Sequence, residues 1–200
     1  MSLATIDAAK HLPYTNHMKT SDVSISFETT LYTLDKWTIL PVPEEESVKL
    51  SSRGQVSVTG TINDHEFQTV LEPDGRWSHW MRVDASLQKA ADVTVGDTVK
   101  VQITQTSVWP EPRVPKDFAK ALQIAPEKVQ KLWHDITPMA RWEWIRWVNA
   151  TSIVETRERR VEVSISKMDH GKRRPCCFNL AACTDPYLSR SGRLIQPKAV

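Results

Sequence analysis

The sequence contains few of the residues that carry common catalytic, metal-binding and cross-linking motifs. Only six of its 200 residues are glycine, and they form no glycine-rich phosphate-binding loop. Three cysteines clustered towards one end are an odd number and a poor disulfide framework, so we expect free thiols in a reducing compartment. Six histidines show no metal-ligand spacing such as His-x-x-x-His. We therefore expect no metal and no cofactor.

Long apolar runs and a strong net charge are also missing. No apolar segment approaches the ~18 residues needed to span a membrane, so we expect no membrane span. Residues 1–7 lack the basic start and apolar run of a secretory signal, which together with the free thiols predicts a cytoplasmic protein. The net charge of +2 gives no overall attraction to nucleic acid. One local excess remains, with nine Lys or Arg against five Asp or Glu between Arg141 and Arg174.

Residues 22–108 have the pattern of a β domain. Apolar and small polar residues alternate through 55–62, and the clearest alternation runs through 98–103. Turn residues separate further short strands, expected at 27–32, 37–41, 67–71 and 77–83, and a short helix is expected at 84–91. Five or more short strands favour a small antiparallel β-barrel, because barrel closure removes open sheet edges.

Residues 114–178 have the 3.6-residue periodicity of helices, after a proline-rich linker at 109–113. Prolines at 115, 126 and 138 suit the first positions of three helices, with Thr137 as an N-cap. A fourth helix is expected to start at a capping box, Ser152–Glu155, and to stop at Gly171. Its body also alternates like a strand. The class is therefore α+β, a small antiparallel β-barrel followed by a compact three- to four-helix module.

Two terminal segments show neither pattern. Residues 1–21 are polar and aperiodic and are expected to form a loose extension. Residues 179–200 are expected to form a polar tail that is mobile from residue 184 onwards.

Several motifs resemble known bacterial domains. The β half resembles a small barrel domain of unknown function, similar in fold to the double-split barrel of AbrB-type regulators, in its residues 37–43, 60–62 and 96–99. The helical half resembles the YdeI/OmpD-associated, or bacteriocin-protection, family through residues 114–115, 141–147, 155–160 and 171–175. The likeness covers about residues 22–178. It implies a bacterial cytosolic protein linked to stress or peptide-toxin tolerance, and it implies no reaction and no catalytic residues.

The eight tryptophans suggest a binding site as well as a core. Trp133, Trp144 and Trp147 fit the buried stripe of the helices and are expected to be core. Others are candidates to line a cleft between the barrel and the helices, where aromatic rings and nearby polar groups would hold a small molecule or peptide. The expected ligand-binding residues are Trp77, His79, Trp80, Trp109, Arg141, Trp142 and Arg146.

The basic run supplies candidate anion-binding residues, because arginine can grip a phosphate or carboxylate with two hydrogen bonds. These are Arg157, Arg160, Lys172, Arg173 and Arg174. Arg157 shares a helical face with Val161 and Ile165. The favoured interpretation is therefore that it pairs with an acid or carbonyl at the edge of the core.

Three functions remain open from the sequence alone. Binding or sequestration of a small molecule or peptide is preferred, because aromatic residues are abundant and no catalytic signature is complete. A nucleic-acid-binding regulator would use the basic helical region, although the small net charge is unfavourable. An enzyme would need a site at the domain junction, with His79, an acid such as Asp74 or Asp84, or a Cys176 thiolate.

Overall fold

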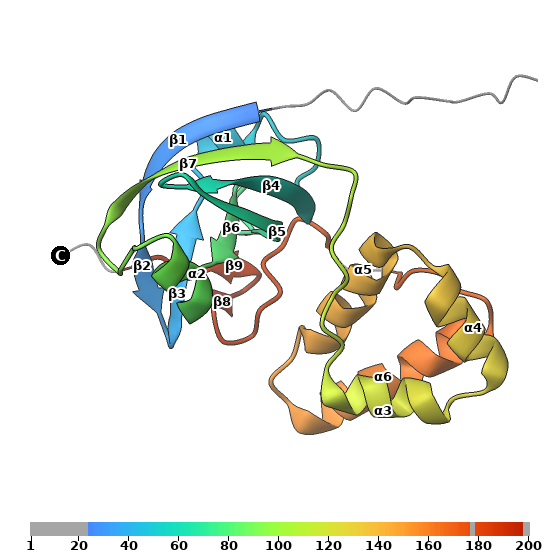
Figure 1. Ribbon diagram of the computed structural model, residues 1–200. Coiled ribbons are helices and arrows are strands. Elements are labelled where there is room, and N and C mark those ends of the chain that lie inside the picture. Colours follow the sequence, from blue (N-terminus) through green and yellow to red (C-terminus); the bar gives the residue numbers. More distant parts are fainter. Residues whose placement is uncertain (1–23, 177–178, 198–200) are drawn as a thin grey trace, which may run out of the picture.

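The computed structural model of the chain describes residues 24–176 and 179–197, so the predicted N-terminal extension lies outside the described residues. One sheet of seven antiparallel strands forms the first half, in the order β1-β7-β4-β5-β6-β3-β2. Its strands are β1 (Ser24–Thr30), β2 (Tyr32–Leu34), β3 (Trp37–Pro41), β4 (Val56–Ile62), β5 (His65–Pro73), β6 (His79–Arg82) and β7 (Thr98–Gln105). The sheet curls into a half-barrel whose outer strands are β1 and β2 (Figure 1).

The alternating pattern of the sequence creates the core of the half-barrel. In β7, Val99, Val101 and Ile103 are buried while the intervening polar residues are exposed. They pack with Val58 and Ile62 of β4 in one cluster of buried apolar side chains. Two short helices, α1 (Glu44–Ser47) and α2 (Ala85–Ala90), connect the strands. The side chain of Asp84 caps α2 by accepting the Leu87 N–H.

Four helices follow the linker and form a separate cluster (Figure 1). They are α3 (Lys116–Ile124), α4 (Glu127–Asp135), α5 (Pro138–Asn149) and α6 (Val154–Asp169). Phe118, Val129, Trp144 and Val148 are fully buried within this cluster, as their helical spacing indicates. The α+β class and the order of a curled antiparallel sheet followed by about four helices are confirmed.

Details of the helix starts differ from the predictions. Pro138 is the first residue of α5 and Thr137 caps it, as expected, whereas Pro115 and Pro126 occupy the N-cap positions of α3 and α4. The predicted capping box at Ser152 is wrong. Helix α6 has Ile153 at its N-cap and no side-chain cap. The Ile153 N–H donates instead to the Thr151 hydroxyl, which precedes the helix.

The predicted polar, mobile tail is also wrong for the residues that the structure describes. After α6 the chain returns to the half-barrel and forms a hairpin of β8 (Ser189–Arg190) and β9 (Arg193–Leu194) (Figure 1). Leu188 and Leu194 are buried against Ile39 and Trp80 of the sheet. The Leu194 N–H donates to the Asp74 carbonyl. A few apolar residues in a mostly polar segment are enough to dock it, because they cover apolar surface that the sheet would otherwise expose.

Because the C-terminal segment is docked on the sheet, we expect Cys176 and Cys183 to differ in reactivity. Cys183 is buried with Leu188 and Leu194, and burial raises the pKa of its thiol to about 11. Cys176 is exposed, and Lys167 Nζ lies 3.3 Å from its sulfur. In a Cys177→Ser variant titrated with an aromatic disulfide reagent at pH 8, we expect one thiol to react rapidly and the second only on unfolding. Two rapid thiols would contradict the docking.

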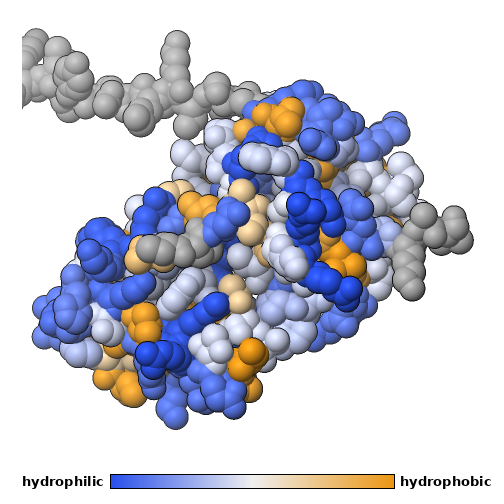
Figure 2. Space-filling view, turned by 180° about the vertical axis from the view of Figure 1, so that it is seen from behind, coloured by the Kyte–Doolittle hydropathy of each residue, from blue (hydrophilic) through white to orange (hydrophobic). Residues whose placement is uncertain are grey.

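Large apolar side chains that reach the surface are scattered. Trp77, Ile124 and Ile153 are each more than half exposed but belong to different elements. On the face shown in Figure 2, the hydrophobic residues lie singly or in small groups among hydrophilic ones. Within the described residues, no helix is long and apolar enough to cross a membrane.

Candidate functional site

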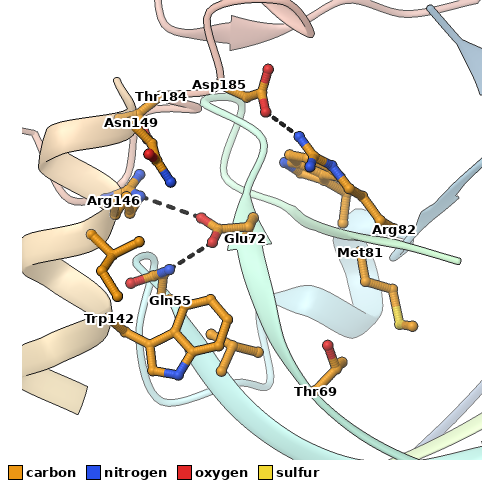
Figure 3. A pocket seen from close by; sticks show the side chains of 13 residues that line it. Gln55, Thr69, Glu72, Met81, Arg82, Trp142, Arg146, Asn149, Thr184 and Asp185 are labelled. Atoms are coloured by element: carbon orange, nitrogen blue, oxygen red, sulfur yellow. Dashed lines mark hydrogen bonds and ion pairs between the residues drawn. The ribbon is translucent and has the colours of Figure 1, made fainter. Parts of the chain in front are cut away.

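A cavity of about 290 Å³ lies where the half-barrel, α5 and the returning C-terminal segment meet. Figure 3 shows α5 on one side and strands of the sheet on the other. The sheet side supplies residues from β5 and β6, the helix supplies one face of α5, and the C-terminal segment closes the rim. The lining residues are Gln55, Thr69, Val70, Glu72, Trp80, Met81, Arg82, Trp142, Ile145, Arg146, Asn149, Thr184 and Asp185.

A buried ion pair joins the two halves of the protein at this cavity. Arg146 of α5 has only 3% of its side chain exposed, and its Nε lies 3.3 Å from the Glu72 carboxylate of β5. Gln55 Nε2 donates to the other Glu72 oxygen at 2.6 Å (Figure 3). Arg146 also donates to the Ala182 carbonyl, so it contacts the sheet and the C-terminal segment at once. Burial raises the pKa of Glu72, while Arg146 and the Gln55 hydrogen bond act in the opposite direction.

A second charged pair closes another side of the cavity. Arg82 of β6 forms an ion pair with Asp185 of the C-terminal segment. Its guanidinium lies 4.2 Å from the centre of the Trp37 ring and 5.9 Å from that of Trp80. The Asp185 carboxylate also accepts the N–H groups of Tyr187 and Leu188, which fixes the turn that carries it. These contacts hold the rim in place.

Trp142 contributes the aromatic wall on α5. Its indole N–H donates to the Pro110 carbonyl at 2.8 Å, so the ring is anchored to the linker. The linker is held from the other side too, since the Ser57 hydroxyl donates to the Val108 carbonyl. The position of Trp142 at the cavity therefore depends on contacts with the linker as well as on α5.

The structure brings together three of the predicted ligand-binding residues. Trp80, Trp142 and Arg146 line this cavity. Trp109 lines a neighbouring cavity of about 350 Å³, which shares Gln55 and Arg146 with the first. Arg141 instead donates to the carbonyls of Trp133, His134 and Ile136 at the end of α4 and pairs with Glu111 of the linker.

Trp77 and His79 lie outside both cavities. The predicted strand 77–83 is shorter, because Trp77 adopts a left-handed backbone (φ 78°) before β6 begins at His79. Its side chain is exposed. His79 is buried with both ring nitrogens bonded, Nδ1 to the Ser47 hydroxyl and Nε2 to the Gly54 carbonyl, each at 2.7 Å.

The predicted anion-binding residues do not converge on one site. Arg157 pairs with Asp117 of α3 and donates to Asn149, which matches the favoured interpretation of this residue. Arg160 donates to the Trp147 carbonyl and lies against its ring. Arg173 and Arg174 pair with Asp135 and Glu143 respectively, and Lys172 is exposed.

The residues considered for catalysis are also dispersed. None of His79, Asp74, Asp84 and Cys176 lines either cavity at the domain junction. The Asp74 carboxylate accepts N–H groups from Arg76 and Ser78, and that of Asp84 caps α2. Among the described residues, no group of three or more His, Cys, Asp or Glu could hold a metal ion.

Sequence reasoning did not single out Glu72, Gln55, Arg82, Asn149 or Asp185, which provide most of the polar wall. One signal was present. Glu72 is the acid at the end of the apolar run Val70-Leu71 in a strand, and an acid beside a core strand needs a partner. Its partner is 74 positions away in the sequence numbering, on α5, and no pattern along the chain pairs the two.

Comparisons with known protein families match both halves of the chain. Residues 27–103 match the domain of unknown function DUF1905, and residues 111–171 match the family described as bacteriocin-protection, YdeI or OmpD-associated (OmdA). A search of curated proteins finds no match. The half-barrel is therefore a DUF1905 domain, and the helical module that follows it is a bacteriocin-protection, YdeI or OmpD-associated domain.

Proposed function

We propose that this protein is a cytoplasmic binding protein that holds a small molecule or short peptide between its two domains, without turnover. The observation that carries the proposal is the 290 Å³ cavity, which both domains and the C-terminal segment line. It combines a buried ion pair with an aromatic and aliphatic wall formed by Trp80, Trp142 and Ile145. Cavities of mixed apolar and polar lining at domain junctions are frequent ligand sites.

The family of the helical domain supports a role in tolerance to a toxin or stress, because its description is bacteriocin protection. Sequestration would give such tolerance without catalytic residues. It requires only that the cavity hold its ligand tightly enough to lower the free concentration.

Fluorine NMR of the protein labelled with 5-fluorotryptophan tests the site directly. Binding of members of a fragment library should shift the resonances of Trp142 and Trp80, which line the cavity, and leave that of Trp77 unchanged. Trp142→Phe assigns the first resonance and should weaken binding, since it shortens the aromatic wall. Trp77→Phe is the matched control, because Trp77 is 68% exposed and lines neither cavity. A library in which no fragment shifts Trp142 would reject the proposed function.

A further inference from the structure

The charges that line the junction cavity compensate one another. Its lining includes two acids and two arginines, and they form the pairs Glu72–Arg146 and Arg82–Asp185. A ligand with a net charge would bring a new charge into a partly dehydrated site that has no unpaired counterion in its lining. Such a group loses hydration without a compensating partner. These paired charges disfavour a ligand with a net charge. Among the described residues the buried Arg82 Nε has no hydrogen-bond partner, so it offers a further donor to a ligand carbonyl.

Two side-chain amides in the cavity have fixed orientations. Gln55 must turn its NH₂ group to the Glu72 carboxylate, which is paired with Arg146 and can only accept. Asn149 must turn its carbonyl oxygen to Arg157, because a guanidinium can only donate, and Arg157 Nη1 does so at 2.9 Å. The charged partners thus decide which end of each amide remains for a ligand.

The remaining ends form a complementary pair across the cavity. Gln55 Oε1 is an acceptor that points towards α5, and Asn149 Nδ2 is a donor that points towards the Glu72–Arg146 pair (Figure 3). Neither atom has another hydrogen-bond partner among the residues described. Trp142 and Ile145 line the same cavity and belong to α5, as Asn149 does. A ligand that fills the site must therefore offer one N–H and one C=O beside an apolar or aromatic body.

We infer that the cavity recognises an uncharged amide, such as a lactam or a blocked peptide group, attached to an apolar side chain. This inference rests on the proposed function, since it names the class of ligand for the same site. The ligand N–H donates to Gln55 Oε1, its carbonyl accepts from Asn149 Nδ2, and its apolar part lies against Trp142. Charged analogues of the same shape are rejected.

Three probes that share a phenylalanine side chain test the inference. At pH 6.0, N-acetylphenylalaninamide is neutral, N-acetylphenylalanine is an anion, and phenylalaninamide is a cation, because an α-amino group has a pKa of about 7.7. Titrations followed by the fluorine resonance of Trp142 should show that the neutral probe binds about 10-fold more tightly than either charged one, because an unpaired charge in this site loses hydration without a compensating partner. Equal or tighter binding of a charged probe would overturn the inference.

Asn149→Asp provides a sharper test with little risk to folding. Asn149 is exposed, and the new carboxylate can still accept from Arg157 while it replaces the free donor by a negative acceptor. We expect the affinity for N-acetylphenylalaninamide to fall about 10-fold and that for phenylalaninamide to rise. The control is Gln123→Glu on α3, which makes the same change from amide to acid outside the cavity lining and should alter neither value.

The outcomes separate this inference from the proposed function. If charged probes shift Trp142 and the neutral probe does not, the cavity is a ligand site but the inference fails. An Asn149→Asp variant with unchanged preference also overturns the inference alone. If none of the three probes binds, the inference fails, and the fragment screen decides independently whether the cavity binds any ligand.

Discussion

Replacing Arg146 by methionine should lower the free energy of unfolding by about 3 kcal/mol. The variant keeps most of the side-chain volume but leaves the Glu72 carboxylate without the cation that compensates its burial. We place the effect at the lower end of the range for broken buried pairs, because 26% of the Glu72 side chain remains exposed. Urea denaturation followed by far-UV circular dichroism measures the change, with the slope of the transition checked for loss of two-state behaviour.

Two further variants show whether the lost charge is the cause. The double variant Glu72→Met, Arg146→Met should recover a large part of the loss, because no charge is then left buried and unpaired. Arg174→Met is the matched control. Arg174 also pairs with an acid, Glu143, but is 49% exposed, so its loss should cost less than about 1 kcal/mol. If Arg146→Met destabilised the protein no more than Arg174→Met, the ion pair would not be what holds the domains together.

Replacing His79 by alanine should cost about 3 kcal/mol, because it leaves two buried hydrogen-bonding groups unsatisfied. The Gly54 carbonyl can only accept, so Nε2 carries the proton and the neutral Nδ1 accepts from the Ser47 hydroxyl. These bonds connect β6 to the end of α1 and to the loop before β4. Denaturation at pH 7.5 measures the loss, and His79→Gln, which can still donate to Gly54, should lose less.

His79 should also make stability depend on pH. Burial lowers the pKa of this histidine below its ordinary value of 6.5, and the positive charge of Arg53 acts in the same direction. The unfolded chain therefore takes up a proton below about pH 6.5 that the folded protein resists, so stability is retained above that pH and falls towards the lowered pKa. The slope contributed is at most about 1.4 kcal/mol per pH unit for one proton.

Comparing the wild type with His79→Gln between pH 7.5 and 5 isolates this contribution. The wild type should lose stability more steeply, since glutamine does not titrate. Parallel profiles for the two proteins would show that His79 takes up its proton equally well in the folded state.

Elements with a clear periodic pattern were predictable from the sequence. Strand β7 alternates without interruption, and helices α3 to α5 each carry an apolar stripe beside a proline or threonine start, so their residues dictate both conformation and buried face. Trp144 was correctly assigned to the core by its spacing. The failures occurred where the local pattern was weak. In the segment after residue 179, three buried residues are separated by polar ones, and contacts with distant parts of the chain, among them β3 and β6, hold them in place.

The candidate site shows the same division. Trp80, Trp142 and Arg146, which line the cavity, were among the candidates that the sequence offered because aromatic and basic residues are frequent in these segments. The polar partners were not, because Glu72 and Asp185 gain their roles from residues on other elements. The orientation of the Gln55 and Asn149 amides could not be predicted either, since it is set by their hydrogen bonds to Glu72 and Arg157.

The antiparallel sheet, the helical module that follows it and the resemblance that the family matches confirm could all be predicted from the sequence. These features depend on residues close together in the chain, whose periodicity and turn chemistry act locally. The docking of the C-terminal segment on the sheet and the pairing of Glu72 with Arg146 beside a cavity depend instead on contacts made in the folded protein. Such pairings bring distant residues together to bury apolar surface and compensate charge, and many pairings are compatible with one linear pattern.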